Sequence, residues 1–91
     1  MTRYTVTATR KAKNDLALLW LRASDRRAIS QAADAIDQVL REDAPQKGCK
    51  AGQGIRQLIV SPLVAEFSVQ EHDRTVTIWS VRHIGELTNG H

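Results

Sequence analysis

The sequence lacks the features typical of exported and membrane proteins. It contains a single cysteine, Cys49, so no disulfide can form within the chain. No apolar run approaches the roughly 18 residues that a membrane-spanning helix needs. The first residues, MTRYTVTATRKAK, also lack the apolar core of a signal peptide. These absences predict a cytoplasmic protein that does not associate with membranes.

The length and the balance of charges set the next bounds. At 91 residues, 42% of them hydrophobic, residues 1–91 fit one domain with a single core. The formal net charge of +3 is unevenly distributed, because residues 1–30 hold seven Lys or Arg against two Asp, and residues 47–60 hold three cations and no acid. If the fold joins these two segments, a phosphate backbone or an acidic protein is the natural partner. Ordinary solvated charge is the alternative.

The first third of the chain predicts a strand and then a helix. RYTVTAT alternates apolar and hydroxyl side chains, as a half-buried strand does. Thr9 can then cap a helix whose apolar stripe ends at Leu19 and Trp20. Leu18 and Leu21 lie off that stripe. They indicate a second buried contact, which is either a partner chain or burial between the second helix and the sheet.

A second helix and three strands follow. Ser24 is the expected cap of a helix whose apolar residues repeat at three and four, and Pro45 ends it. The short link between the helices predicts an antiparallel hairpin over about 10–42. After a glycine-rich loop, IRQLIV, LVAEFSV and TVTIWSV predict an antiparallel meander. The expected fold is α+β, in the order β-α-α-β-β-β. Its helical hairpin covers one face of a four-stranded, mainly antiparallel sheet, and the first strand pairs inside that sheet.

This order of elements, with the local motifs GIRQLIV, PLVAEFSV and DRTVTIWSVRHI, resembles the RelE/ParE superfamily of bacterial toxins over about residues 3–84. The resemblance implies a toxin that is neutralised by an antitoxin encoded beside it. RelE-like members cut mRNA on the ribosome without a metal or other cofactor, and ParE-like members inhibit DNA gyrase. We therefore expect an RNA-binding, metal-free mRNA endoribonuclease that inhibits translation. Gyrase inhibition and an inactive protein-binding module are the alternatives.

Metal-free RNA cleavage requires a base, an acid and cations around one phosphate. By resemblance, Arg56 matches the arginine after the glycine turn and Arg82 the basic residue that closes the last strand. Their strands can be neighbours in the meander, so both could reach one phosphate. His83 is the best titrating candidate near neutral pH. Lys47 and Lys50 precede Arg56 and could hold phosphate, while the off-stripe leucines of the first helix, Leu18 and Leu21, are the expected antitoxin contacts.

Several of these assignments leave alternatives open. Arg82 and His83 are adjacent in a strand, so they point to opposite faces unless a bulge intervenes. Glu66 is a weaker candidate for the base, and its alternative is a surface strand residue. Trp79 could stack a base or belong to the core. The last residues, GELTNGH, hold no tyrosine, although RelE-like enzymes often carry a catalytic Tyr or His near the end, and this keeps gyrase inhibition open.

Two further aromatic residues and a histidine have simpler interpretations. Trp20 and Phe67 could stack bases, but both fit core positions better. His72 lies in the QEHDR turn and is expected to be exposed to solvent.

Overall fold

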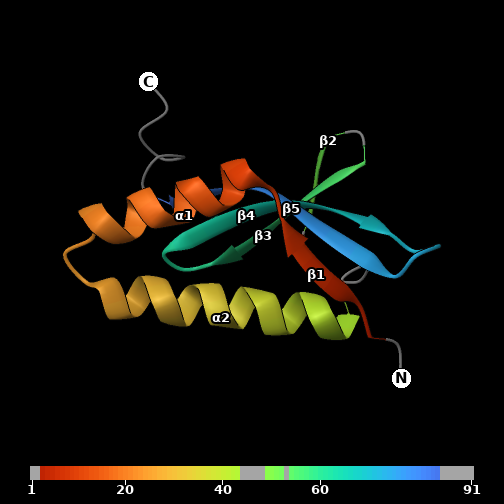
Figure 1. Ribbon diagram of the computed structural model, residues 1–91, viewed down its shortest axis with the longest axis horizontal. Helices are drawn as coiled ribbons and strands as arrows, with labels where there is room; N and C mark the ends of the chain where they lie inside the picture. Colours follow the sequence, from red (N-terminus) through yellow and green to blue (C-terminus); the bar gives the residue numbers. More distant parts are fainter. Residues whose placement is uncertain (1–2, 44–48, 53, 85–91) are drawn as a thin grey trace.

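The computed structural model describes residues 3–43, 49–52 and 54–84, which form two helices and a five-stranded sheet (Figure 1). The elements are β1 (Thr5–Ala8), α1 (Arg10–Arg22), α2 (Arg26–Asp43), β2 (Cys49–Gly52), β3 (Ile55–Val60), β4 (Leu63–Gln70) and β5 (Thr75–His83). The predicted α+β class and the helical hairpin are confirmed. Neither helix in this part of the chain has the length and apolar character needed to cross a membrane.

Short polar side chains begin both helices. The Thr9 hydroxyl accepts a hydrogen bond from the Ala12 amide at 3.1 Å, which confirms the predicted cap of α1. At the start of α2, Asp25 Oδ1 accepts from the Ala28 amide at 3.2 Å. The cap of α2 is therefore Asp25, one residue later than the predicted Ser24.

Arg26 closes the turn between the helices. Its Nε donates to the Trp20 carbonyl at 3.1 Å, and its Nη2 donates to the Leu21 carbonyl at 3.4 Å. The guanidinium carbon also lies 4.5 Å from the centroid of the Trp20 ring. A cation here satisfies carbonyls that the end of α1 leaves without helical partners and complements the helix dipole.

The strands lie in the order β1-β5-β4-β3-β2. The meander of β3, β4 and β5 is antiparallel, as predicted. The glycine-rich segment adds a short fifth strand, because β2 pairs antiparallel with β3. The expectation that the first strand pairs inside the sheet is wrong, since β1 runs parallel to β5 at the edge. After β1 the chain runs through both helices and joins the sheet at the opposite edge, as β2. The strands β3, β4 and β5 then follow one another back across the sheet, so β5 is the strand that pairs with β1.

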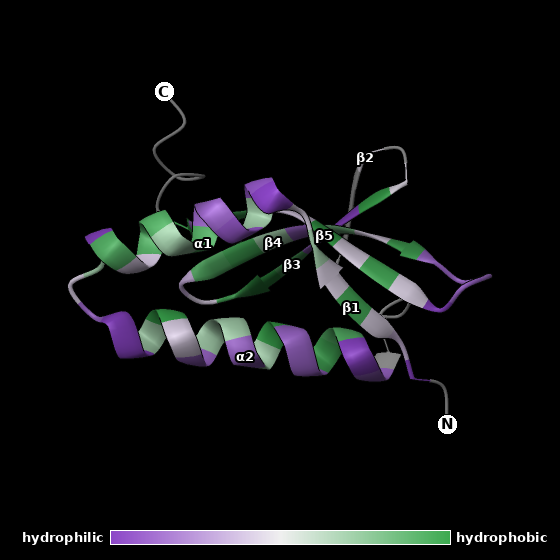
Figure 2. Cartoon of the chain, viewed as in Figure 1, coloured by the Kyte–Doolittle hydropathy of each residue, from purple (hydrophilic) through white to green (hydrophobic). Residues whose placement is uncertain are grey.

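The core lies between the helices and one face of the sheet. Figure 2 shows α2 as alternating hydrophobic and hydrophilic bands, as expected of a helix with one buried side. Phe67 has no exposed surface, which confirms its predicted core position. The buried apolar residues that meet here are Tyr4, Ala12, Ile29, Ala32, Ile36, Leu40, Leu63, Ala65, Phe67, Val76, Ile78 and Val81.

Candidate functional site

A bulge in β5 decides which of its side chains reach the open face, the face of the sheet opposite the helices. Ile78 is buried against the helices and pairs with Phe67. The next pair is Glu66 with Ser80, so Trp79 is an extra residue in β5. An extra residue of this kind interrupts the alternation of side chains along a strand. From Ser80 onward the two faces are therefore exchanged relative to the start of the strand.

The bulge places Arg82 on the open face and His83 on the helix-covered face. Val81 pairs with Ala65 and His83 pairs with Leu63, and both partners belong to the core. Directly paired residues point to the same side of a sheet, and neighbours along a strand point to opposite sides. Without the bulge the assignment would be reversed. The choice that the sequence left open between Arg82 and His83 is thus made by this one irregularity.

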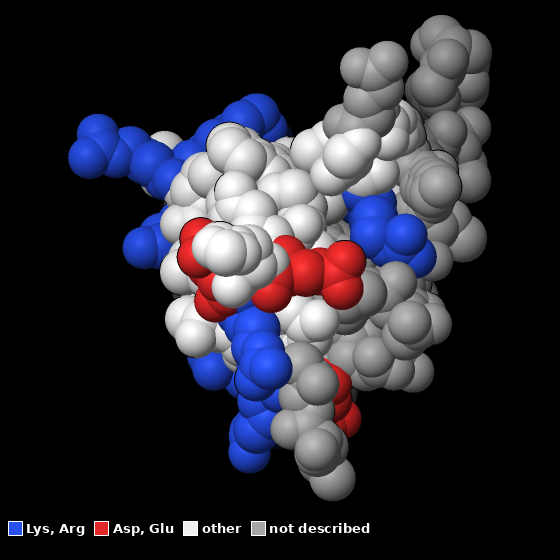
Figure 3. Space-filling model, turned by 90° about the vertical axis from the view of Figure 1, so that its right-hand side faces the viewer, with Lys and Arg blue, Asp and Glu red and all other residues white. Residues whose placement is uncertain are grey.

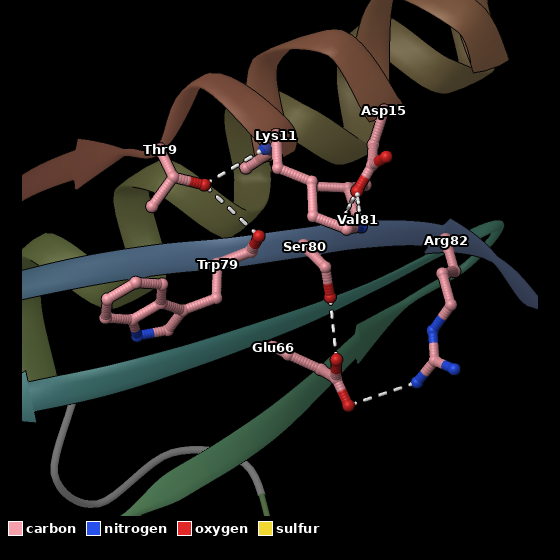
Figure 4. A network of polar contacts seen from close by, with 9 residues as sticks. Thr9, Lys11, Asp15, Glu66, Trp79, Ser80, Val81 and Arg82 are labelled. Carbon is pink, nitrogen blue, oxygen red and sulfur yellow. Dashed lines mark hydrogen bonds and ion pairs between the residues drawn. The ribbon is translucent and has the colours of Figure 1, made fainter.

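A small polar cluster lies beside Arg82 on the open face (Figure 4). One carboxylate oxygen of Glu66 accepts from the Ser80 hydroxyl at 2.7 Å, and the other accepts from Arg82 Nη2 at 3.1 Å. The Arg82 and Glu66 side chains are 38% and 30% exposed, so a ligand can reach both. The Nε of Arg82 is buried and finds no hydrogen-bond partner among the described residues. The cluster therefore joins an accessible cation and an accessible carboxylate.

The other edge of β5 is held by α1, since β1 is shorter than β5 and stops before the bulge. Thr9 Oγ1 donates to the Trp79 carbonyl at 3.2 Å, and Asp15 Oδ2 accepts from the Val81 amide at 3.2 Å. Asp15 Oδ2 also pairs with Lys11 Nζ at 2.9 Å. Figure 4 shows these side chains approaching β5 from the α1 side. The cap residue and one side chain of α1 thus take the place of a strand beside the bulge.

The predicted convergence of Arg56 and Arg82 is wrong. β4 separates their strands, so these strands are not neighbours. Arg56 pairs with Phe67, a core residue, and therefore lies on the helix-covered side of the sheet. Arg82 lies on the open face, so the two guanidinium groups are directed away from each other.

The two predicted phosphate-binding lysines cannot be placed in the site. Lys47 lies outside the described residues. Lys50 belongs to β2, where its backbone is paired with Arg56. The exposed position predicted for His72 is confirmed. Glu66, whose alternative to a catalytic role was a surface position on its strand, has a side chain that is 30% exposed.

Large apolar side chains are exposed along the second half of α1. Leu18 is 48% exposed, Trp20 41% and Leu21 60%. Burial of Leu18 and Leu21 between α2 and the sheet, one of the two explanations that their position allowed, is therefore wrong. The core position predicted for Trp20 is wrong as well, because its ring packs under Arg26 at the end of the hairpin.

These exposed side chains border two hollows. The inter-helix groove has a volume of about 550 Å³ and is lined by Lys13, Leu16, Ala17, Trp20, Leu21, Ile29, Ser30, Ala33 and Asp34. A second hollow of about 310 Å³ lies between α1 and β5, and its walls are Lys11, Asp15, Leu18, Leu19, Arg22, Val81 and Arg82. The first is mainly apolar. The second carries three cations and one acid, so the two hollows suit different parts of a ligand.

Charges of both signs occupy the end of the molecule that Figure 3 faces, where acidic side chains lie among cationic ones. The exposed turn between β4 and β5 contributes Glu71 and Asp73 to the acidic residues of the described chain. The basic patch that residues 1–30 and 47–60 would form together stays a prediction, because Lys47 lies outside the described residues.

The contacts of Asp15 and Ser80 were not predicted from the sequence, and neither was the bonding of Glu66 to Ser80 and Arg82. The apolar pattern of β5 held a signal for this region. Ile78 and Trp79 are consecutive apolar residues, and Val81 then resumes a spacing of two from Trp79. Such a break in strict alternation indicates a bulge. No local pattern indicates that Asp15 meets Val81, which is 66 residues away.

No protein-family model and no curated protein sequence matches the chain. Its fold is similar to several solved structures. One is a chain of the RelBE2 toxin–antitoxin complex of Mycobacterium tuberculosis, with 21% identity, a TM-score of 0.73, and 91% of this chain and 93% of that one covered. A chain of the chromosomal ParDE system of P. aeruginosa has 24% identity, a TM-score of 0.67, and coverage of 90% and 97%.

A third similar structure is the E. coli toxin RelE, in a mutant form that is in complex with a peptide of its antitoxin. It has 12% identity and a TM-score of 0.62, and the match covers 99% of this chain and 96% of that one. The element order, the sheet topology and these likenesses agree. The chain therefore has the α+β fold of the RelE/ParE toxins.

Proposed function

We propose that this chain is the toxin of a toxin–antitoxin pair and that its antitoxin binds along α1. The observation that carries the proposal is the exposed apolar side of α1, in a fold similar to that of chains from toxin–antitoxin complexes. Exposed Leu18, Trp20 and Leu21 lie within about one turn of the same helix. A protein that functions alone gains nothing from keeping three such side chains in water.

The inter-helix groove suits an amphipathic segment of the antitoxin. Its walls are mostly apolar, and Lys13 and Asp34 lie among them. A helix that inserts two or three apolar side chains into a groove is a common mode of peptide recognition. Full burial of a leucine side chain is worth about 1.5–3 kcal/mol, so Leu21 alone could contribute a substantial part of the affinity.

The hollow between α1 and β5 connects antitoxin binding to Arg82. Leu18 and Arg82 both line it, together with Lys11 and Arg22. The acid in this hollow, Asp15, is already bonded to Lys11 and to the Val81 amide. An antitoxin segment with carboxylates would complement the cations and would cover Arg82 while it contacts Leu18. Neutralisation would then follow from occlusion.

The activity that we propose is metal-free cleavage of mRNA on the ribosome, with Arg82 and Glu66 at its centre. The open face presents a guanidinium and a carboxylate 3.1 Å apart, and both are accessible. A guanidinium is well suited to a phosphorane because it stays charged and donates two parallel hydrogen bonds.

In this scheme the Glu66 carboxylate takes the proton of the ribose 2′-hydroxyl as that oxygen attacks phosphorus. The bond from phosphorus to the 5′-oxygen then breaks, and the leaving oxygen takes a proton from solvent. Arg82 stabilises the extra negative charge on the phosphoryl oxygens. The products are a 2′,3′-cyclic phosphate and a free 5′-hydroxyl. Lys47 and Lys50 stay predicted phosphate ligands, and Arg56 and His83 stay secondary candidates.

Antitoxin binding is tested by co-expression with the reading frame next to this gene. We expect rescue of growth and a stable complex. Leu18→Gln and Leu21→Gln should each weaken the complex about 10-fold or more, as losses at interface centres do. Asn14→Gln, an exposed position on α1 outside both hollows, is the matched control. No rescue, or full binding by both leucine variants, would contradict the proposal.

Activity is tested by induced expression with primer-extension mapping of mRNA ends. Arg82→Ala should reduce cleavage about 100- to 1,000-fold and Glu66→Gln at least about 100-fold. Arg56→Ala and His83→Gln should retain more activity, since those residues lie on the other face. Arg27→Ala, an exposed cation at the start of α2, is the control. Full toxicity of both Arg82→Ala and Glu66→Gln, with folding intact, would defeat the cleavage proposal.

Inhibition of DNA gyrase is the second candidate function. The observation that favours it is the separation of Arg56 and Arg82 on opposite faces, which leaves Arg82 without that second guanidinium at the phosphate. The likeness to a chain of the ParDE system supports it as well. Growth arrest with intact mRNA, together with loss of negative supercoiling in a reporter plasmid, would establish this candidate over RNA cleavage.

A further inference from the structure

Trp79 is an exposed aromatic side chain that the fold holds in a defined orientation. It is 45% exposed. Its indole N–H donates to the Ser68 hydroxyl at 2.8 Å. Ser68 follows the core residue Phe67 in β4 and therefore lies on the open face, so the indole lies on that face too. Because Trp79 is the extra residue of the bulge, both it and Ser80 are available on this side of the sheet.

The surroundings of the ring are polar. Its hydrogen-bond partner Ser68 pairs with Thr77, and the Glu66–Ser80–Arg82 cluster follows along the same face. An indole that forms the centre of a protein–protein contact normally lies in a well-packed apolar pocket. Trp79 instead presents a flat ring held by the Ser68 hydroxyl, which suits stacking against a planar, polar molecule.

Arg82 adds a cation to the same face of the sheet as the Trp79 ring. It lies three residues beyond Trp79 on the same strand, which corresponds to about 10 Å of extended chain. Its Nη2 bonds Glu66 and its Nε is buried, but the side chain is 38% exposed, so a phosphate can reach the guanidinium. Proteins that bind single-stranded nucleic acid place aromatic rings for the bases beside cations for the backbone, often on the face of a sheet. The spacing here follows that arrangement.

We propose that Trp79 stacks one unpaired base of a single-stranded RNA whose adjacent phosphate binds Arg82, and that Ser68 positions the ring. The choice of RNA as the polymer rests on the proposed mRNA cleavage. Duplex RNA does not fit, because its bases are already stacked on one another.

Fluorescence titration tests this contact directly. The chain has two tryptophans, so Trp20→Phe leaves Trp79 as the only indole. We expect an eight-nucleotide single-stranded RNA to quench the emission of this variant, and the same sequence as a duplex to leave it unchanged. Absence of quenching by the single strand at saturating concentration, or equal quenching by the duplex, would overturn the proposal.

Affinity measurements assign the roles. Trp79→Ala should weaken binding of the labelled single strand about 5- to 150-fold, the range seen for loss of one stacked base. Trp79→Phe keeps a ring and should lose less. The RNA affinity of Ser68→Ala should lie between that of wild type and that of Trp79→Ala. Its tryptophan emission should change over a wider range of RNA concentrations. Ile59→Ala, which removes another exposed apolar side chain, is the control and should bind normally.

The outcomes separate this inference from the proposed function. Wild-type RNA affinity in Trp79→Ala, with mRNA cleavage retained, would overturn the stacking role and leave the cleavage proposal intact. Weaker binding of the labelled single strand by Trp79→Ala, in a protein that leaves mRNA intact in cells, would support the stacking role while the cleavage proposal fails.

Discussion

The Asp15 carboxylate offers a quantitative test of how α1 holds the edge of β5. Its Oδ2 accepts from the Val81 amide at 3.2 Å and from Lys11 Nζ at 2.9 Å. We predict that Asp15→Ala lowers the free energy of unfolding by about 1–3 kcal/mol. The reason is that the Val81 N–H then lies in a partly buried place without a partner, and the cost of such a group is of this size.

The other effects of the substitution are smaller and partly cancel. The lost ion pair with Lys11, whose side chain is 69% exposed, is worth about 0.3–0.5 kcal/mol. Alanine returns up to about 0.7 kcal/mol through its higher helix propensity. Lys11→Ala removes the ion pair and leaves the Val81 bond, so it should change stability by less than about 0.5 kcal/mol. Asp15→Asn keeps an acceptor oxygen and should lose less than half as much as Asp15→Ala.

Urea unfolding followed by circular dichroism measures all three variants. For a domain of this size the denaturant slope is about 1–3 kcal/mol/M, so a loss of about 2 kcal/mol moves the midpoint by about 1 M. If Asp15→Ala and Lys11→Ala unfold at the same midpoint, the bond to Val81 contributes nothing, and the account of α1 as a substitute strand is refuted.

Three further predictions concern the core, the cap and the hairpin turn. Phe67→Ala should cost about 3–5 kcal/mol in urea unfolding, because the side chain is fully buried, and a loss below about 1.5 kcal/mol would contradict its core role. Thr9→Ala should cost about 0.5–2 kcal/mol in the same assay, while Thr9→Ser, which keeps the hydroxyl, should be nearly neutral. Arg26→Ala should shift the emission of Trp20, measured in a Trp79→Phe background, since the guanidinium no longer covers the ring. An unchanged spectrum would show that the stacked geometry does not persist in solution.

The helical hairpin, the meander and most of the core could be predicted from the sequence. Each rests on local information: Thr9 caps the residues next to it, and the apolar spacing of α2 and the alternation of β4 show which sides are buried. Periodicity of this kind is a property of short segments and needs no knowledge of their neighbours. Phe67 was placed correctly for this reason.

The site depends partly on a bulge, for which the alternation in β5 gives only a sign, and partly on contacts between segments that are distant in the sequence. The sequence predicted that Arg82 and His83 face opposite ways, because adjacent residues in a strand do so unless a bulge lies between them. Only the tertiary structure decided which of them reaches the open face, since one extra residue in β5 reverses every later side chain. The exposure of Leu18 and Trp20 was also decided at this level. A helical stripe shows what can be buried, while burial itself depends on how far the neighbouring helix and sheet extend over it.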